Sequence, residues 1–287
     1  MNQVRRARPL LGTLTQISVA APLAPVDLHA AVDAAFGEIA VVHALMSWHD
    51  ADSELSRLNR CAPGGIARVH AHTRAVLDAA LRIARLSDGA FDPCTGATLA
   101  RWGLLPRHAP SRQLPPRPPQ RASWRDIELT DEGVRFHRPV SLDLGGIAKG
   151  YAVDLAVQRL LQLGIREIVV NAGGDLRVAG TGEHTAVIRH PCSAHAPAHS
   201  LRLHNEALAT SSAFGSERQV HGGAVCALVD PATDRAYAGR DSVSVRAATC
   251  MTADALTKVA LFGSSAVAAA VFEACRAQCI RLEPVVN

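Results

Sequence analysis

The chain has 287 residues, of which 48% are hydrophobic, so it is long enough to bury a substantial core. Its formal net charge is +4 and only 4% of its residues are aromatic, which argues against the basic, base-stacking surface of nucleic-acid-binding proteins. The sequence contains no run of 18 apolar residues, so we expect no membrane span. Seven cysteines without paired CxxC spacing argue against a disulfide framework and a zinc site.

The N-terminal segment contains several arginines but lacks the apolar core of a signal peptide. Residues 10–19 alternate between apolar and small or polar side chains, as a strand does. The first cysteine, Cys61, lies too far along the chain to carry a lipid anchor. We therefore expect an uncleaved protein in the cytoplasm.

Two amphipathic helices are predicted in the first third of the chain. From Asp27 onward, apolar residues recur every three or four positions, and this aspartate lies within reach of the N-cap role. A second helix is predicted from Thr73 and should end near Gly89. Residues 106–120 include six prolines mixed with arginines, a composition that predicts an inserted surface loop.

The rest of the chain consists mainly of short predicted strands. A β-hairpin is predicted over residues 127–137, and helices are predicted from about Thr252 and Ser264. Further strands are predicted at residues 165–171, 185–189, 201–203, 224–229, 242–246 and 280–286. Because the pattern has no regular βαβ alternation and no internal repeat, it favours the α+β class.

The stretch SLDLGGIAKGYAVD, residues 141–154, combines a carboxylate, two glycines and a lysine within a few positions. It predicts a strand, a tight turn at the glycine pair and an amphipathic helix that carries Lys149 and ends at Gly164. The spacing GGIAKG is not that of a Walker A loop, and the glycines near residue 180 lack the third glycine of a dinucleotide fingerprint. Taken alone, a glycine turn followed by a solvated lysine is the simpler interpretation.

Three other stretches also combine glycines or small residues with an acid. They are FDPCTG at residues 91–96, NAGGD at residues 171–175 and ADALTK at residues 253–258. In the last one, Asp254 should share a helical face with Thr257 and Lys258. Each stretch alone can be explained as a turn, a hairpin or a helix cap.

Taken together, these stretches resemble the ApbE family, the FAD:protein FMN transferases, from about Leu11 to Leu261. The motifs that carry the resemblance are, in chain order, SELSRLN, FDPCTGATLARWG, LDLGGIAKGYAVD, VVNAGGDLRVAG, ALATSS, DP and ADAL. The resemblance implies a single, T-fold-like α+β body over residues 1–287, with antiparallel sheets and flanking helices. It also implies that FAD is cleaved with the assistance of Mg²⁺. The FMN half would be attached by a phosphoester to a Ser or Thr hydroxyl of a target flavoprotein, with release of AMP.

The resemblance further implies which residues bind the substrate and the metal. The expected FAD contacts are Leu11, Trp48, Ala90, Phe91, Asp92, Asp143, Lys149 and Thr210. The expected metal ligands are the main-chain carbonyl of Gly146, the carboxylate of Asp254 and the hydroxyl of Thr257, all of them oxygen donors that suit Mg²⁺. We expect Asp254, Thr257 and Lys258 to carry the catalysis.

Two positions depart from the family pattern. The family has ADALxT, with a threonine four residues after the aspartate, where this chain has Lys258, whose ammonium cannot ligate Mg²⁺, so we expect weaker Mg²⁺ dependence. The family segment HxxDP has Ala227 in place of its histidine, and His221 is a candidate substitute base, although a surface histidine is the simpler interpretation. Two alternatives therefore stay open: a protein that binds FAD or hydrolyses it to FMN and AMP without flavinylating a partner, and an interaction module with a decayed pocket.

Overall fold

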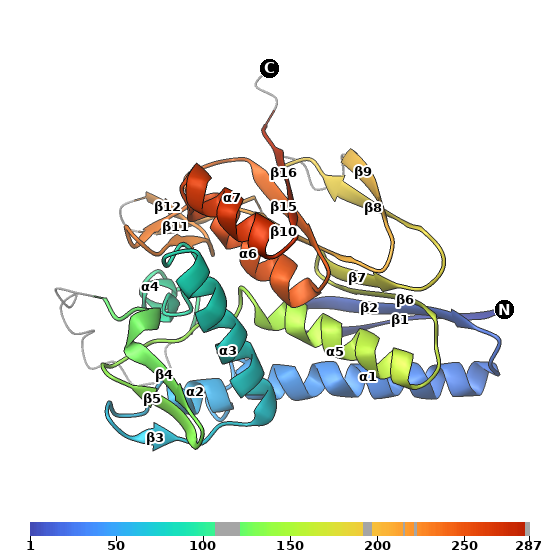
Figure 1. Ribbon diagram of the computed structural model, residues 1–287, viewed down its shortest axis with the longest axis horizontal. Helices are drawn as coiled ribbons and strands as arrows, with labels where there is room; N and C mark the ends of the chain where they lie inside the picture. Colours follow the sequence, from blue (N-terminus) through green and yellow to red (C-terminus); the bar gives the residue numbers. More distant parts are fainter. Residues whose placement is uncertain (107–120, 192–196, 215, 221–222, 285–287) are drawn as a thin grey trace.

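The computed structural model describes residues 1–106, 121–191, 197–214, 216–220 and 223–284 (Figure 1). Its centre is a seven-stranded sheet in the order β1-β2-β6-β7-β10-β15-β16, in which every neighbouring pair is antiparallel. The strands are β1 (Asn2–Leu10), β2 (Thr13–Ala21), β6 (Glu167–Ala172), β7 (Asp175–Ala179), β10 (Ala207–Ser212), β15 (Ser242–Ala247) and β16 (Gln278–Leu282). The first and last strands of the chain thus form opposite edges of one sheet.

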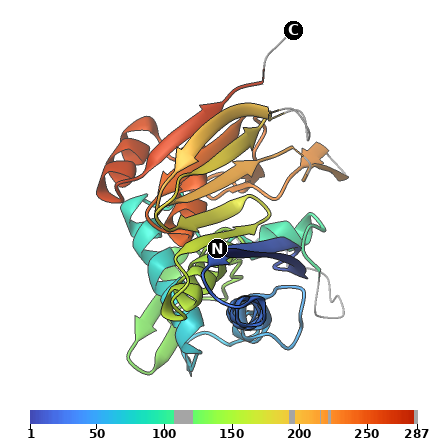
Figure 2. The same ribbon diagram turned by 90° about the vertical axis from the view of Figure 1, so that its right-hand side faces the viewer.

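Three helices cover one face of this sheet: α1 (Pro25–Met46), α5 (Ala148–Gln162) and α6 (Cys250–Phe262). Alternate residues of β6 are buried against them in the main hydrophobic core. The hairpin of β8 (His184–Arg189) and β9 (Pro197–Leu203) encloses a second, smaller core on the opposite face. Figure 2 shows α1 end-on beneath β1 and β2, with this hairpin on the far side of the sheet.

The remaining elements gather at one end of the sheet, on the left of Figure 1. Among them are the helices α2 (Glu54–Leu58), α3 (Ala71–Leu86), α4 (Gly96–Arg101) and α7 (Ser265–Ala274) and the short 3₁₀ helix η1 (Trp124–Asp126). A three-stranded sheet has the order β3 (Ile66–Ala67), β5 (Gly133–Phe136), β4 (Ile127–Thr130). Two short hairpins are formed by β11 (Arg218–Val220) with β12 (Gly223–Val225) and by β13 (Val229–Asp230) with β14 (Arg235–Ala236).

Helix α1 is notable for its apolar composition. Among the described helices it alone is long and apolar enough to cross a bilayer by length and hydropathy, a criterion less strict than an uninterrupted apolar run. Its residues Leu28, Val32, Phe36 and Ile39 have no exposed surface because they pack into the main core. Core packing is therefore sufficient to explain the composition of this helix.

The α+β class is confirmed, and so are most of the predicted elements. The helix predicted from Thr73 is α3, the hairpin over residues 127–137 is β4–β5, and the helix after the glycine pair is α5. Helix α5 is followed by Gly164 at a φ of 82°, a left-handed conformation that glycine adopts without strain. The predicted loop, apart from Pro106, lies outside the described residues.

Several local predictions were wrong. Residues 10–19 are not one strand, because Leu11 and Gly12, at φ values of 57° and 71°, form the turn between β1 and β2. Asp27 is not a helix cap, because Pro25 already begins α1 and places this aspartate in its first turn. The segment predicted as the strand 224–229 is divided between β12 and β13.

The start of the stretch at residues 141–154 was also predicted wrongly, since residues 141–147 form an extended segment and a turn rather than a strand. Its backbone is satisfied by other partners: the amide of Leu142 donates to Asn59 Oδ1 at 2.7 Å, and the amide of Asp143 donates to the carbonyl of Pro93 at 2.7 Å. These bonds hold the segment beside the loop at residues 91–96.

Candidate functional site

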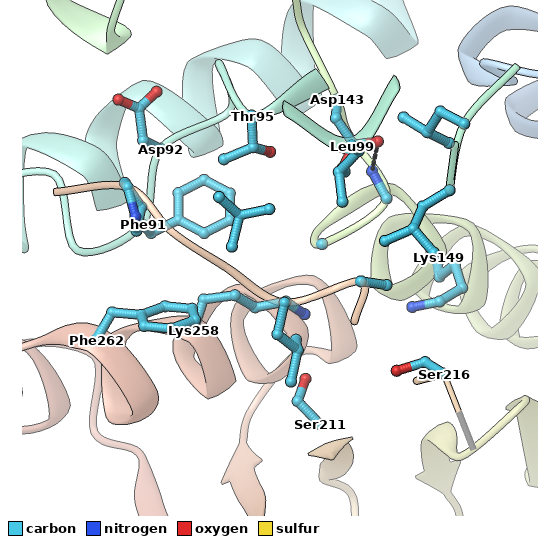
Figure 3. A pocket seen from close by; sticks show the side chains of 18 of the residues that line it. Phe91, Asp92, Thr95, Leu99, Asp143, Lys149, Ser211, Ser216, Lys258 and Phe262 are labelled. Atoms are coloured by element: carbon cyan, nitrogen blue, oxygen red, sulfur yellow. Dashed lines mark hydrogen bonds between the residues drawn. The ribbon is translucent and has the colours of Figure 1, made fainter. Parts of the chain in front are cut away.

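A cavity of about 350 Å³ lies where four parts of the fold meet (Figure 3). Its walls come from the loop after α3 together with α4, from the turn before α5, from β10 and the segment that follows it, and from α6. Residues separated by more than 150 positions therefore line one cavity, and a concave site of this kind is the ordinary place for a small ligand.

The structure brings most of the predicted site residues to this cavity. Those that line it are Ala90, Phe91, Asp92, Asp143, Gly146, Lys149, Thr210 and Lys258. Asp254 and Thr257 do not line the cavity, since they are almost completely buried in α6. Leu11 and Trp48 do not line it either.

Leu11 and Trp48 make structural contacts elsewhere. The amide of Leu11 donates to Nδ1 of His43 at 3.2 Å, which ties the β1–β2 turn to the end of α1. The indole of Trp48 packs so closely on Gly96 that an added Cβ there would lie 2.4 Å from the ring, and its Nε1 donates to the carbonyl of Pro106 at 2.9 Å. An FAD contact by either residue stays a prediction.

Lys149 and Lys258 line the cavity, and behind them two buried aspartates, Asp175 and Asp254, complete a charged cluster. Lys149 Nζ lies 2.5 Å from Asp175 Oδ2 and 3.5 Å from Asp254 Oδ2. Lys258 Nζ lies 2.6 Å from Asp254 Oδ1 and 3.1 Å from the main-chain oxygen of the same residue. The Asp254 carboxylate is therefore held between ammonium groups from two helices.

Burial and charge shift the pKa values of this cluster in different directions. Burial would lower the pKa of Lys149, but the Asp175 and Asp254 carboxylates raise it above its ordinary value. Burial favours a higher pKa for Asp254, yet Lys149 and Lys258 hold it below the ordinary value. The pKa of Asp175 is raised because burial outweighs the attraction of the lysines. Lys149 is thus a fixed cation at neutral pH.

Close packing of α5 against α6 brings these charges together. Gly150 lies so near the start of α6 that an added Cβ would be 2.3 Å from the carbonyl oxygen of Cys250. The carboxylate of Asp154, one turn further along α5, accepts hydrogen bonds from the amides of Cys250 and Met251, both at 2.9 Å. A carboxylate at a helix N-terminus accepts hydrogen bonds from amides that have no partner within the helix. Its negative charge also interacts favourably with the positive end of the helix dipole. The position of Lys149 relative to Asp254 follows from this packing.

Hydroxyl groups continue the site beneath the lysines. Thr257 Oγ1 donates to the main-chain oxygen of Asp254 at 2.7 Å and lies 2.7 Å from Ser211 Oγ. Thr210 Oγ1 lies 2.7 Å from Ser244 Oγ on the neighbouring strand. Thr257 is therefore engaged within the protein, whereas Thr210 and Ser211 line the cavity.

Two further aspartates shape the opposite wall. Asp143 Oδ1 accepts the amide of Gly145 at 3.1 Å, which fixes the turn before α5. Asp92 Oδ1 accepts the amide of Cys94 at 2.9 Å, and its Oδ2 lies 3.3 Å from Nη2 of Arg121. Burial raises the pKa of both carboxyl groups above the ordinary value. The hydrogen bonds that Asp143 and Asp92 accept from main-chain amides hold this wall of the cavity in place.

Some site residues were not proposed from the sequence. Asp175 lies in the NAGGD stretch and pairs with Lys149, but nothing in the local pattern indicates a partner 26 positions away. Ser211, within the motif ALATSS, and Phe262, directly after the end of the resemblance at Leu261, also line the cavity. Ala227, which replaces the expected histidine, lines the cavity as well, while the candidate base His221 lies outside the described residues.

Comparisons with known proteins match nearly the whole chain. The profile of the ApbE family matches residues 11–280. A protein of Vibrio cholerae named FAD:protein FMN transferase is 30% identical over 224 residues, which cover 74% of this chain and 66% of that protein. A Treponema pallidum protein of the same name is 28% identical over 281 residues, covering 89% and 77% of the two chains.

Solved structures agree with this comparison. The crystal structure of the ApbE protein of Thermotoga maritima superposes with a TM-score of 0.84 at 26% identity, covering 98% of this chain and 94% of that one. The flavin transferase ApbE of Vibrio cholerae superposes with a TM-score of 0.79 at 26% identity, covering 98% and 93%. The T-fold-like α+β fold that the motifs predicted is therefore the fold of these two solved ApbE proteins.

Proposed function

The chain belongs to the ApbE family, and on this basis we propose that it transfers the FMN half of FAD to a hydroxyl group of another protein and releases AMP. The observation that carries the proposal is the pair of lysines, Lys149 and Lys258, at a cavity lined by the family motifs. Two lysine side chains at one cavity are suited to a ligand with a doubly negative diphosphate.

The reaction is a phosphoryl transfer in which the protein mainly positions groups and neutralises charge. The acceptor hydroxyl oxygen forms a bond to the phosphorus of the FMN half, and the bond from that phosphorus to the bridging oxygen breaks. AMP leaves with the bridging oxygen, and the hydroxyl proton passes to a base or to solvent. Lys149, anchored by Asp175 and Asp254, would stabilise the negative charge on the phosphate oxygens throughout this exchange.

The shape of the surface supports a ligand with two halves. A second hollow of about 730 Å³ shares Ala90, Asp92, Pro231 and Phe262 with the first cavity, so the two adjoin. Phe91 and Phe262 give the first cavity apolar wall area, and Trp124 lines the second. A dinucleotide with its diphosphate at the lysines could extend into both hollows.

The Mg²⁺ assistance implied by the family resemblance stays a prediction, and the side chains do not fit a metal ion well. Of the expected ligands, Asp254 has an ammonium group facing each carboxylate oxygen, and Thr257 is buried and bonded to Ser211 and to the main chain. A divalent ion would have to bind beside two positive charges. We therefore assign no step of the reaction to a metal.

The acceptor would be a flavoprotein with an accessible Ser or Thr hydroxyl, as the family resemblance implies. The test is incubation of the purified chain with FAD and a flavin-free candidate acceptor domain, followed by denaturing electrophoresis. We expect fluorescent FMN that stays on the acceptor after denaturation, and none with an acceptor whose hydroxyl residue is replaced by alanine.

The same experiment distinguishes the alternatives. Free FMN and AMP without labelled acceptor would indicate a FAD pyrophosphatase, and bound but intact FAD would indicate a binding protein. No affinity for flavin at all would favour an interaction module and would overturn the proposal.

A further inference from the structure

Lys258 stands where the family motif ADALxT has its threonine. The inference drawn from this residue rests on the proposed function. We propose that the ammonium group of Lys258 is a built-in cation that replaces a divalent ion at Asp254. In this chain the diphosphate of FAD would then be held between two lysines, and neither binding nor transfer would require metal.

The Lys258 ammonium lies among the groups expected to hold the ion. Its Nζ is 2.6 Å from Asp254 Oδ1 and 3.1 Å from the Asp254 main-chain oxygen. On its other side the lysine passes against Gly146, where an added Cβ would lie 2.9 Å from Cε and 3.5 Å from Nζ. The Lys258 side chain thus packs against Gly146 while its ammonium binds Asp254, and these are two of the three residues expected to supply metal ligands.

The charges of the cluster leave little attraction for a further cation. Asp254 Oδ1 faces Lys258, and Oδ2 faces Lys149 at 3.5 Å and the amide of Gly150 at 3.4 Å. Asp175 is paired with Lys149 at 2.5 Å, and the nearby carboxylate of Asp143 accepts the amide of Gly145 at 3.1 Å. The carboxylates of Asp254 and Asp175 are therefore already paired with the two ammonium groups before any ligand arrives, which leaves neither of them free for a divalent ion.

Lys258 also retains a donor for the ligand. An ammonium group has three N–H donors, and two of them are directed to Asp254. The side chain lines the cavity and is 18% exposed, so the third donor can reach a phosphate oxygen. Figure 3 shows Lys149 from α5 and Lys258 from α6 extending toward the same part of the cavity. Together they place two ammonium groups, already paired with carboxylates on their inner side, where they can donate charge-assisted hydrogen bonds to phosphate oxygens.

The first test is direct metal binding by the FAD-loaded protein. Mn²⁺, a paramagnetic substitute for Mg²⁺, is titrated and the free ion is followed by electron paramagnetic resonance, at concentrations where FAD alone binds none. We expect no saturable Mn²⁺ site in the wild type. The variant Lys258→Thr, which restores the hydroxyl of the family motif and removes the charge, should bind one Mn²⁺ per chain.

The second test is FAD affinity measured by calorimetry in EDTA and in excess MgCl₂. The dissociation constant of the wild type should change by less than about twofold, whereas Lys258→Thr should bind FAD about tenfold more tightly with Mg²⁺ than with EDTA. Lys258→Arg, which keeps a positive charge but offers no metal ligand, should remain independent of Mg²⁺.

One stoichiometric Mn²⁺ in the FAD-loaded wild type, or wild-type FAD binding abolished by EDTA, would overturn the proposal while leaving the transferase function intact. If the wild type bound FAD neither in EDTA nor in excess MgCl₂, the proposed function itself would be overturned. Both decisive measurements use the wild type, so they stand even if Lys258→Thr does not fold, which its thermal melting curve would reveal.

Discussion

Replacing Gly150 with alanine should destabilise the protein and weaken FAD binding, because α5 packs against the backbone of α6 at this residue and leaves no room for a side chain. The new Cβ would lie 2.3 Å from the carbonyl oxygen of Cys250 and 2.7 Å from Cα of Met251. Ordinary contacts begin near 3.4 Å. Both obstacles are backbone atoms that cannot rotate away, so the helices must move apart by about 1 Å.

The change in the free energy of unfolding of Gly150→Ala is the sum of an unfavourable and a favourable contribution. Overpacking of this kind costs about 1–3 kcal/mol, and the upper end applies to a contact with backbone. Alanine is favoured over glycine inside a helix by about 1 kcal/mol, which leaves a net loss of about 2 kcal/mol. In a chain of this size the melting temperature should fall by about 3 °C.

The same displacement should affect the ligand site. The bond from the amide of Gly150 to Asp254 Oδ2, at 3.4 Å, and the Lys149–Asp254 contact, at 3.5 Å, both span the two helices. Separation would move Lys149 away from Asp254, so we expect the FAD dissociation constant, measured by calorimetry, to rise about tenfold.

Gly37→Ala in α1 is the matched control. Gly37 is also inside a helix, but it is exposed and an added Cβ there meets no atom within 4 Å. This variant should be more stable by about 0.5–1 kcal/mol and should bind FAD like the wild type. A Gly150→Ala protein that melts at or above the wild-type temperature would show that this account of the helix packing is wrong.

Two further predictions concern charged side chains. Lys149→Met should raise the FAD dissociation constant at least about tenfold in calorimetry, since a fixed charge beside the diphosphate is lost, and unchanged affinity would contradict the assigned role. Asp234→Asn should lower the free energy of unfolding by about 1–2 kcal/mol at pH 7, because Asp234 accepts hydrogen bonds from Thr98 and Arg101. Although burial acts in the opposite direction, these bonds hold the pKa of Asp234 below its ordinary 3.8. Its contribution is therefore present above about pH 4 and is lost as the pH falls through the folded-state pKa, so the two melting curves should converge in acid. Asp33→Asn, at an exposed ion pair, should leave the melting temperature unchanged, and an equal loss in both variants would refute the argument.

The sequence by itself determined the main helices and the family. Apolar periodicity predicts α1, α3, α5 and α6, because a helix that packs on a sheet must bury one face. The spacing of Asp254 and Lys258 predicts that they share a helical face, and they form an ion pair at 2.6 Å. The ordered motifs indicated the ApbE family, and the comparisons confirm it.

Only the tertiary structure decided which residues meet. Asp175 reaches Lys149 because β7 packs beneath α5, and Thr210 lies opposite Ser244 through the pairing of β10 with β15. Trp48, which the resemblance gave as an FAD contact, packs on Gly96 at the start of α4 and does not line the cavity. Such contacts depend on strand register and on helix packing, which are set by the whole core. The spacing of residues within one segment of the sequence therefore does not predict them.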